Sequence, residues 1–272
     1  MTMATGARGR ARWGAWAAAG CALLALAGCA TPQEEPPAAQ VVTPSDEPEN
    51  RRRARIRLEL ASGYYAEGKT DIALDELKQV IAADPAYPEA YNLRGLIFMR
   101  LNDMRQAEDS FRRALSLNPR NPNVHHNYGW LQCQLGRYPE AVRSFEQALA
   151  NPTYGDKPKT LMTLGLCQAR SGNRADAERN LMRSYELDAG NPITGYNLAQ
   201  LLYMRGDYER AQFYIRRLNN SELANSESLW LGIKVENRMK DNVAMEQLSD
   251  QLRKRFPQSK ERAALDRRAF DE

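Results

Sequence analysis

The sequence has very few of the side chains from which enzymes build metal and catalytic centres. Its 272 residues include two histidines and four cysteines. His125 and His126 are adjacent, so on a helix they point about 100° apart and cannot chelate one metal without a third ligand. HExxH, CxxC and GxSxG motifs are absent, and the carboxylates are too scattered to indicate an acid/base pair. The sequence therefore predicts a protein that is not an enzyme and that holds no metal, no cofactor and no small-molecule substrate.

Long apolar runs are also scarce, and the one near the start is too short to span a membrane. Residues 13–27 carry no charge and follow the arginine-rich stretch 8–12, which is the order found in a secretory signal. The run ends in Leu-Ala-Gly-Cys, which resembles the lipobox of bacterial lipoproteins. This resemblance implies cleavage before Cys29, lipidation of Cys29 and, with Ala30 following, sorting to the outer membrane. The alternatives are an ordinary signal with an incidental cysteine and an uncleaved anchor.

The sequence divides into four segments. We expect a lipoprotein signal peptide at 1–28, a lipidated cysteine with a tether at 29–50, helical repeats at 51–257 and a capping helix or tail at 258–272. Residues 30–50 contain five prolines and five acids with almost no apolar content, which is typical of a disordered tether. At ~3 Å per residue this tether could hold the repeats up to ~60 Å from a membrane.

Net charge gives no indication of a nucleic-acid partner. Without the three arginines of the signal peptide, the 38 basic and 34 acidic residues become 35 and 34, a net charge near +1. We interpret the arginine run 51–53 as the solvated start of the first helix, with a contact to membrane headgroups as the alternative.

A repeat of about 34 residues organises the rest of the chain. Three positions recur with steps of 34, 34, 36, 34 and 33 residues. The first is a small residue: Ala61, Gly95, Gly129, Gly165, Ala199 and Gly232. The second is an alanine: Ala73, Ala107, Ala141, Ala177, Ala211 and Ala244. The third, four residues later, is large and apolar: Leu77, Phe111, Phe145, Leu181, Ile215 and Leu248.

This pattern describes pairs of helices that approach closely at the small residues and fill the surrounding space with the large ones. Glycines at 68, 136, 172 and 206 mark turns within pairs. The step of 36 marks a lengthened loop at 151–158, which we interpret as a tolerated surface loop, with a local contact point as the alternative. A period near 34 with these residues is the tetratricopeptide repeat (TPR) pattern. We therefore predict an all-α fold, a right-handed superhelix of six TPR hairpins with a C-terminal capping helix.

The cysteines Cys133 and Cys167 lie near the ends of the first helices of the third and fourth repeats. These helices are neighbours in a TPR array, so a disulfide is expected in an oxidising compartment. The alternative is a pair of small buried side chains that stay reduced.

A TPR array binds partners on the face of its first helices that points away from the second helices. Carried onto this sequence, the predicted binding residues are Leu58, Tyr65, Asn92, Leu96, Met99, Asn123, His126, Trp130, Cys133, Met162, Leu166, Tyr196 and Tyr203. Leu, Met, Trp and Tyr are adaptable anchors for a peptide, and the asparagines can hydrogen-bond a bound backbone. The alternative for each apolar residue is packing between adjacent first helices. For the set as a whole we expect binding, centred on residues 96–130 with Trp130 as the hot spot.

The stretch His-Asn-Tyr-Gly-Trp-Leu-Gln-Cys at 126–133, in the third of six repeats behind a lipobox, resembles the type IV pilus biogenesis/stability lipoproteins of the PilF/PilW type. YNLRGLIFMRLNDMRQAEDSFRRAL and GDYERAQFYIRRL are also similar to that family. His126 stands where the family pattern has a second asparagine. The resemblance implies a pilotin, which is anchored by lipid to the periplasmic face of the outer membrane, binds the outer-membrane secretin subunit and promotes its localisation and multimer assembly.

Two other functions fit the same sequence features. One is a TPR scaffold in another cell-envelope machine, such as outer-membrane protein assembly. The other is an adaptor lipoprotein that tethers and regulates a cell-wall enzyme.

Overall fold

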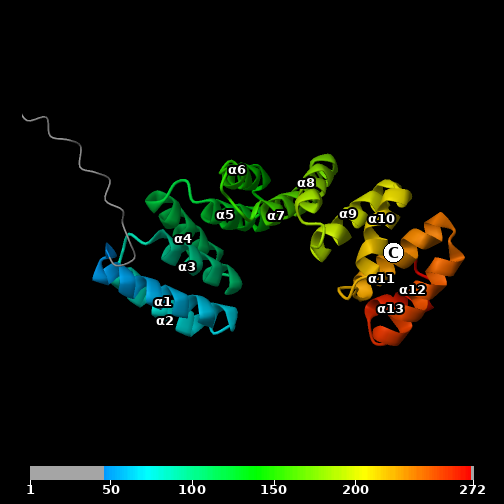
Figure 1. Cartoon of the computed structure of the whole chain (residues 1–272), viewed down its shortest axis with the longest axis horizontal. Coiled ribbons are helices and arrows are strands. Elements are labelled where there is room, and N and C mark those ends of the chain that lie inside the picture. The colour runs from blue at the N-terminus through cyan, green and yellow to red at the C-terminus, as the bar shows by residue number, and fades with distance from the viewer. Residues whose placement is uncertain (1–45, 271–272) are drawn as a thin grey trace, which may run out of the picture. The chain divides into compact units, whose positions relative to one another are not determined.

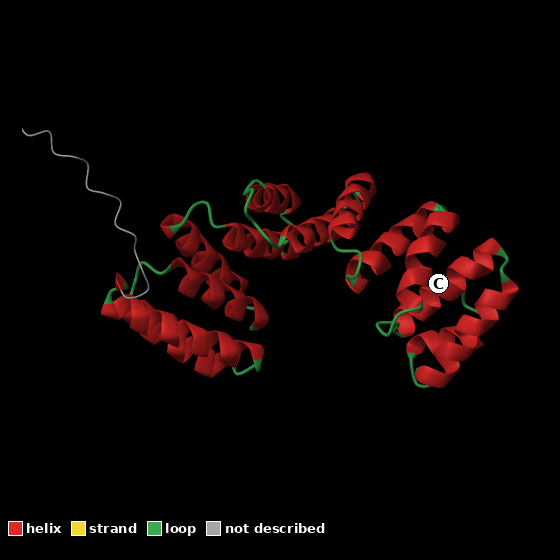
Figure 2. Ribbon diagram, in the orientation of Figure 1, coloured by secondary structure: helices red, strands yellow, loops and turns green. Residues whose placement is uncertain are grey.

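The structure is a computed structural model that describes residues 46–270. The predicted signal peptide 1–28, Cys29 and most of the predicted tether lie outside the described residues. The described fold belongs to the compact unit formed by residues 47–272. Within the described part of the chain there are thirteen α-helices and no strand (Figures 1 and 2). None of these helices combines the length and the apolar character needed to cross a membrane.

The first twelve helices form six hairpins, in which each odd-numbered helix packs most extensively on the helix that follows it. The hairpins are α1 (Glu49–Ala66) with α2 (Thr70–Ala83), α3 (Pro88–Arg100) with α4 (Met104–Leu117), α5 (Pro122–Gln134) with α6 (Tyr138–Leu149), α7 (Lys157–Arg170) with α8 (Arg174–Leu187), α9 (Pro192–Arg205) with α10 (Tyr208–Asn219), and α11 (Ser226–Met239) with α12 (Asn242–Arg255). The predicted all-α fold of six TPR hairpins is confirmed.

Close helix contact within a hairpin depends on the small residue of the first helix. A Cβ atom added to Gly95 of α3 would lie 2.6 Å from Cε1 of Phe111 in α4. A Cβ atom added to Gly165 of α7 would lie 2.8 Å from Cγ of Leu181 in α8. Both large side chains are fully buried, so each fills the space that the glycine leaves open. The sequence alignment of the repeats therefore corresponds to real contacts.

Each of the six hairpin turns contains a residue in the left-handed region. Four of these residues are the predicted glycines, Gly68, Gly136, Gly172 and Gly206, with φ between +72° and +85°. Asn102 and Lys240 are the left-handed residues in the turns of the second and sixth hairpins, each with φ of 60°. Asparagine tolerates this conformation, whereas lysine is an uncommon choice that sequence rules do not anticipate.

The C-terminal segment covers the last hairpin as predicted. Helix α13 (Lys260–Asp266) packs on α11 and α12, and its Leu265 is buried in their apolar cluster. Phe270 stacks on Trp230 of α11, with the ring centroids 5.7 Å apart. At the other end, α1 begins at Glu49, two residues before the expected start at Arg51. The acidic Glu49 in the first turn is favourable at a helix N-terminus.

Candidate protein-binding face

The predicted binding residues lie along the first helices α1, α3, α5, α7 and α9, and we call the surface that they share the first-helix face. Ten of them are half-buried: Leu58, Tyr65, Asn92, Leu96, Met99, Trp130, Met162, Leu166, Tyr196 and Tyr203. Asn123 is exposed, whereas His126 and Cys133 are buried. Eight of these ten side chains, all except Asn92 and Leu166, pack against the buried apolar clusters of the hairpins and still present part of their surface to solvent.

His126 is held inside the array instead of facing a partner. Its side chain is 7% exposed, and its Nδ1 atom lies 2.8 Å from Oγ1 of Thr160 in α7. The hydroxyl of Tyr154 lies 3.0 Å from the same Thr160 oxygen. Burial, and after it the nearby cation Lys159, lowers the pKa of His126 to about 4, so the imidazole is neutral at pH 7. The lengthened loop 151–158 is therefore anchored to α5 and α7 through Tyr154, whereas the sequence indicated a tolerated surface loop.

Neighbouring first helices are also joined directly. The side-chain amide of Asn127 in α5 donates to Oδ1 of Asn92 in α3 at 3.0 Å. Cys133 of α5 and Cys167 of α7 form a disulfide, with their Cα atoms 5.9 Å apart. These contacts connect the second, third and fourth repeats across the first-helix face.

Cations cover three of the aromatic side chains on this face. Arg100 lies 3.8 Å from the ring centroid of Tyr65, and Arg170 lies 4.9 Å from that of Trp130. The ammonium of Lys234 lies 5.5 Å from the Tyr203 centroid. Contacts of this kind contribute ~0.5–2 kcal/mol each. These cations were not among the predicted binding residues, although Arg100 and Arg170 each follow the small residue of their helix by five positions.

Two adjoining hollows lie along the C-terminal part of the first-helix face. A hollow of about 410 Å³ lies among α7, α8 and α9, and one of about 650 Å³ lies among α9, α11 and α13. Gln200 and Met204 of α9 line both of them. Of the predicted binding residues, Leu166 lines the first, and Tyr196 and Tyr203 line the second. These hollows give the face room for side chains of a bound segment.

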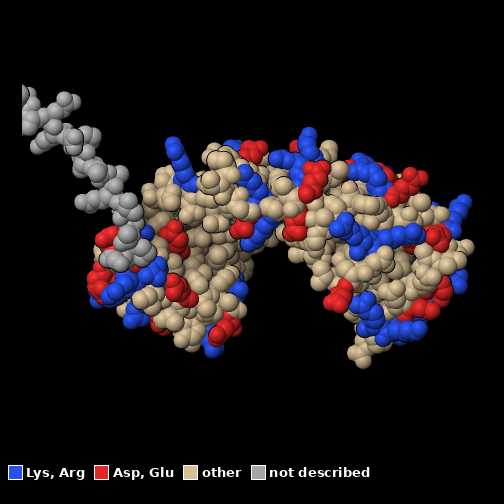
Figure 3. Space-filling view, in the orientation of Figure 1, with Lys and Arg blue, Asp and Glu red and all other residues tan. Residues whose placement is uncertain are grey.

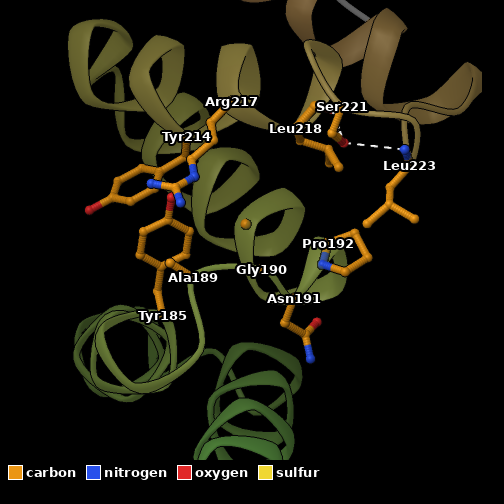
Figure 4. Close-up of a pocket in the computed structure, with 11 residues that line it drawn as sticks. Tyr185, Ala189, Gly190, Asn191, Pro192, Tyr214, Arg217, Leu218, Ser221 and Leu223 are labelled. Atoms are coloured by element: carbon orange, nitrogen blue, oxygen red, sulfur yellow. Dashed lines mark hydrogen bonds between the residues drawn. The ribbon is translucent and has the colours of Figure 1, made fainter.

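A smaller cavity of about 110 Å³ lies between the α8–α9 loop and the end of α10 (Figure 4). Tyr185 and Tyr214 meet there edge to face with their ring centroids 4.9 Å apart, beside Arg217. Within residues 46–270 the buried Tyr185 hydroxyl has no hydrogen-bond partner. The cavity is not lined by any residue of the predicted binding set.

Charge is spread over the molecule. Figure 3 shows acidic and basic side chains interspersed over the visible side of the helical array. Among the described residues no group of three or more His, Cys, Asp or Glu side chains is placed to hold a metal ion. The arrangement is therefore one of contact surfaces, with aromatic, aliphatic and cationic side chains brought together on one row of helices.

Comparisons with known proteins agree with this architecture. Two family models described as tetratricopeptide repeat match the chain. One matches residues 58–123 and 127–192, and the other matches residues 110–143. The chain is 26% identical over 204 residues to the type IV pilus assembly protein PilF of Pseudomonas aeruginosa, covering 75% of this chain and 81% of that protein. It is also similar to the crystal structure of PilW, a widely conserved type IV pilus biogenesis factor, with 28% identity, a TM-score of 0.72 and coverage of 78% of this chain and 97% of that one. The solved structure of Pseudomonas aeruginosa PilF gives 25% identity, a TM-score of 0.73 and coverage of 80% and 99%.

These relationships and the six hairpins define an all-helical TPR protein. The similarity is more specific than a shared repeat pattern, because the alignments cover nearly the whole length of the two solved pilus proteins. Within the TPR class, the chain is a protein of the PilF/PilW type.

Proposed function

We propose that the chain is a non-enzymatic, lipid-anchored TPR protein of type IV pilus biogenesis. It binds the outer-membrane secretin subunit through the first-helix face and promotes secretin localisation and multimer assembly. The observation that carries this proposal is the similarity to PilF and PilW, which extends over three quarters or more of the chain. No nucleic acid or small-molecule substrate takes part.

The first-helix face supplies the binding chemistry. Its half-buried Leu, Met, Trp and Tyr side chains can cover apolar surface on an unassembled secretin subunit and so keep that surface from aggregating. Lipidation at Cys29 anchors the carrier in the outer membrane at its periplasmic face, and the tether leaves the array free to reach the subunit. Anchoring raises the effective concentration of the bound subunit at the membrane where the multimer assembles.

The test in cells is a blot of outer-membrane fractions for the pilus secretin in a strain that lacks this gene. Loss of detergent-resistant multimers with survival of the monomer supports the proposal. Restoration by the wild-type gene, and failure of restoration by a Cys29→Ala form, would assign the localisation step to the lipid. Normal multimers in the normal membrane would overturn the proposal and favour a scaffold for another envelope machine or an adaptor for a cell-wall enzyme.

The test in vitro concerns Trp130, which lies at the centre of the face. If it is a binding hot spot, Trp130→Ala weakens secretin binding by about 2 kcal/mol, roughly 30-fold in Kd. Phe213→Ala is the matched control, because Phe213 is an aromatic residue that is 59% exposed on the second helix α10. Isothermal titration calorimetry of both variants, with circular dichroism to verify folding, makes the comparison. Undiminished affinity of a folded Trp130→Ala protein would remove Trp130 from the interface.

A further inference from the structure

The small cavity between the α8–α9 loop and the end of α10 lies where the fifth repeat lacks a side chain that other repeats have. Four positions before the small residue of each first helix, the six repeats carry Arg57, Tyr91, His125, Leu161, Gly195 and Ser228. Tyr91 is 7% exposed and Leu161 is 2% exposed, so each is packed into the fold. Gly195 lines the cavity, and a Cβ atom added to it would meet one atom within 4 Å, Cε2 of Tyr185 at 3.9 Å. The cavity is therefore space that a larger residue fills in other repeats.

The rings of the second and third repeats show how this space is used. The Tyr91 hydroxyl donates to the carbonyl oxygen of Pro85 at 3.1 Å. Nε2 of His125 lies 2.8 Å from the carbonyl oxygen of Pro119. In both repeats the acceptor lies six positions before the ring, in the loop that precedes the first helix. The corresponding loop residue of the fifth repeat is Ala189, which lines the cavity.

A cation stands beside the ring of the second repeat. Arg113 lies 5.6 Å from the centroid of the Tyr91 ring. Arg217 is the residue of the fifth repeat that corresponds to Arg113, and it also lines the cavity. A guanidinium is attracted to the face of an aromatic ring. The fifth repeat thus keeps the cation and the loop that surround a ring in the second repeat, but it lacks the ring.

Tyr185 fills part of the space and leaves a cavity of about 110 Å³. Figure 4 shows Tyr185, Tyr214 and Arg217 on one side of this cavity and Pro192 and Leu223 on the other. Cavities of ~150 Å³ can admit benzene. The present cavity is smaller, but Arg217 and Leu223 of its lining are exposed, so it opens to solvent and a ring can enter without being fully enclosed.

We propose that the cavity is a binding site for a tyrosine side chain of a partner protein. The ring of this tyrosine lies against Arg217, and its hydroxyl donates to the carbonyl oxygen of Ala189, as the Tyr91 hydroxyl donates within the chain. A protonated histidine would meet the like charge of Arg217, which favours the neutral phenol. Leu223 and Ile193, which are 53% and 51% exposed, offer apolar area to the residues that flank the tyrosine. The site uses no residue of the predicted binding set and does not rest on the proposed function.

The test uses the soluble chain 30–272, which contains the whole compact unit, and four probes. Three are synthetic peptides that carry tyrosine, phenylalanine or alanine between two leucines in a Gly/Ser background, and the fourth is p-cresol, the tyrosine side chain without a backbone. Nuclear magnetic resonance titrations of the labelled protein give the affinities. We expect the tyrosine peptide to bind and to shift the amide signals of Gly190 and Asn191. The phenylalanine peptide should bind about fivefold more weakly because it lacks the donor, and the alanine peptide and p-cresol more weakly still.

Variants locate the site. Gly195→Leu fills the cavity with the residue that the fourth repeat has at this position, and it should abolish binding of the tyrosine peptide. Arg217→Met should weaken binding about threefold by removing the cation. Arg183→Met is the matched control, because Arg183 is an exposed arginine of α8 outside the cavity lining, and it should leave the affinity unchanged. Circular dichroism verifies folding, and Arg217→Met decides the question if Gly195→Leu does not fold.

Several results would overturn the proposal. Equal affinity for the three peptides would show that the ring is not recognised. Unchanged binding of the tyrosine peptide to folded Gly195→Leu or to Arg217→Met would place the contact elsewhere. Binding of p-cresol as tight as that of the tyrosine peptide would assign the cavity to a free phenol instead of a protein. Concentration-dependent dimerisation that Gly195→Leu abolishes, measured by analytical ultracentrifugation, would assign the cavity to a second copy of this chain.

Discussion

The tight contact within the second hairpin can be tested by adding a single methyl group. In Gly95→Ala the new Cβ atom would lie 2.6 Å from Cε1 of Phe111, closer than such contacts are found, and the fully buried ring cannot swing into solvent. Overpacking of this kind costs about 1–3 kcal/mol. Replacing a helical glycine with alanine gains up to about 1 kcal/mol of helix propensity. We expect a net loss of about 1–2 kcal/mol in the free energy of unfolding.

Gly63→Ala is the matched control, since Gly63 is also helical and a Cβ atom there meets no atom within 4 Å. Only the propensity term remains, so we expect a gain of about 0.5–1 kcal/mol. The double variant Gly95→Ala/Phe111→Leu recreates the pairing of the first hairpin, where Ala61 stands with Leu77. It should be less destabilised than the sum of its single changes, because the smaller side chain makes room for the methyl group.

Urea denaturation of the 30–272 chain, followed by circular dichroism, measures all of these changes. The slopes should agree between variants, which is a necessary check because repeat arrays can lose cooperativity. Gly95→Ala as stable as Gly63→Ala would refute the argument that the contact sets the helix separation. Strict additivity in the double variant would refute the role given to Phe111.

Three further predictions rest on contacts between repeats. The pKa of His126 falls from 6.5 to about 4 on folding, so the unfolded chain binds more protons between these pH values, and acidification from about pH 6.5 to 4 should lower the free energy of unfolding by about 3 kcal/mol. Urea titrations across this pH range should show the loss, and His126→Asn should flatten it. The same pH dependence in His126→Asn as in the wild type would contradict the buried neutral imidazole. Replacing Cys133 and Cys167 together with serine should lower the free energy of unfolding by about 3–4 kcal/mol, given their sequence separation of 34. A lack of any effect of dithiothreitol on wild-type unfolding would argue against the bond. Arg216 donates from Nε and Nη2 to the fully buried carboxylate of Glu236, so Arg216→Met should lower the free energy of unfolding by about 3 kcal/mol by leaving that charge without its cation. Adding Glu236→Leu to the same chain should recover most of this loss in thermal melts. An Arg216→Met protein as stable as the wild type would contradict the role given to the ion pair.

The hairpins were predictable because their determinants are local. A small residue in one helix and a large one in the next are separated by a short turn, so their contact recurs at a fixed spacing and the repeat pattern reveals it. Gly95 with Phe111 and Gly165 with Leu181 are contacts of this kind. The turns at Lys240 and Asn102 were harder to predict, because residues other than glycine rarely adopt the left-handed conformation and so do not identify such a turn in a sequence.

Apart from the Cys133–Cys167 disulfide, contacts between hairpins were not predictable from the same pattern. His126, Thr160 and Tyr154 meet only because α7 lies beside α5 and the lengthened loop folds back over both. Periodicity says that two positions are equivalent, but it does not say which of them turns inward. His126 therefore looked like a binding residue, although it is a buried link between the third and fourth repeats.

The first-helix face has two parts that differ in how closely neighbouring first helices are linked. From α3 to α7 side chains of neighbouring first helices engage one another, as in the amide contact of Asn127 with Asn92 and the disulfide of Cys133 with Cys167. From α7 to α13 the face is hollowed, and Met204 stands exposed between the hollows. Cross-linked helices resist rearrangement and present a fixed surface, whereas a hollow edged by a flexible methionine can adjust to its occupant. One row of helices thus offers a preorganised part and an adaptable part, and a partner that requires both must be long enough to lie along several repeats.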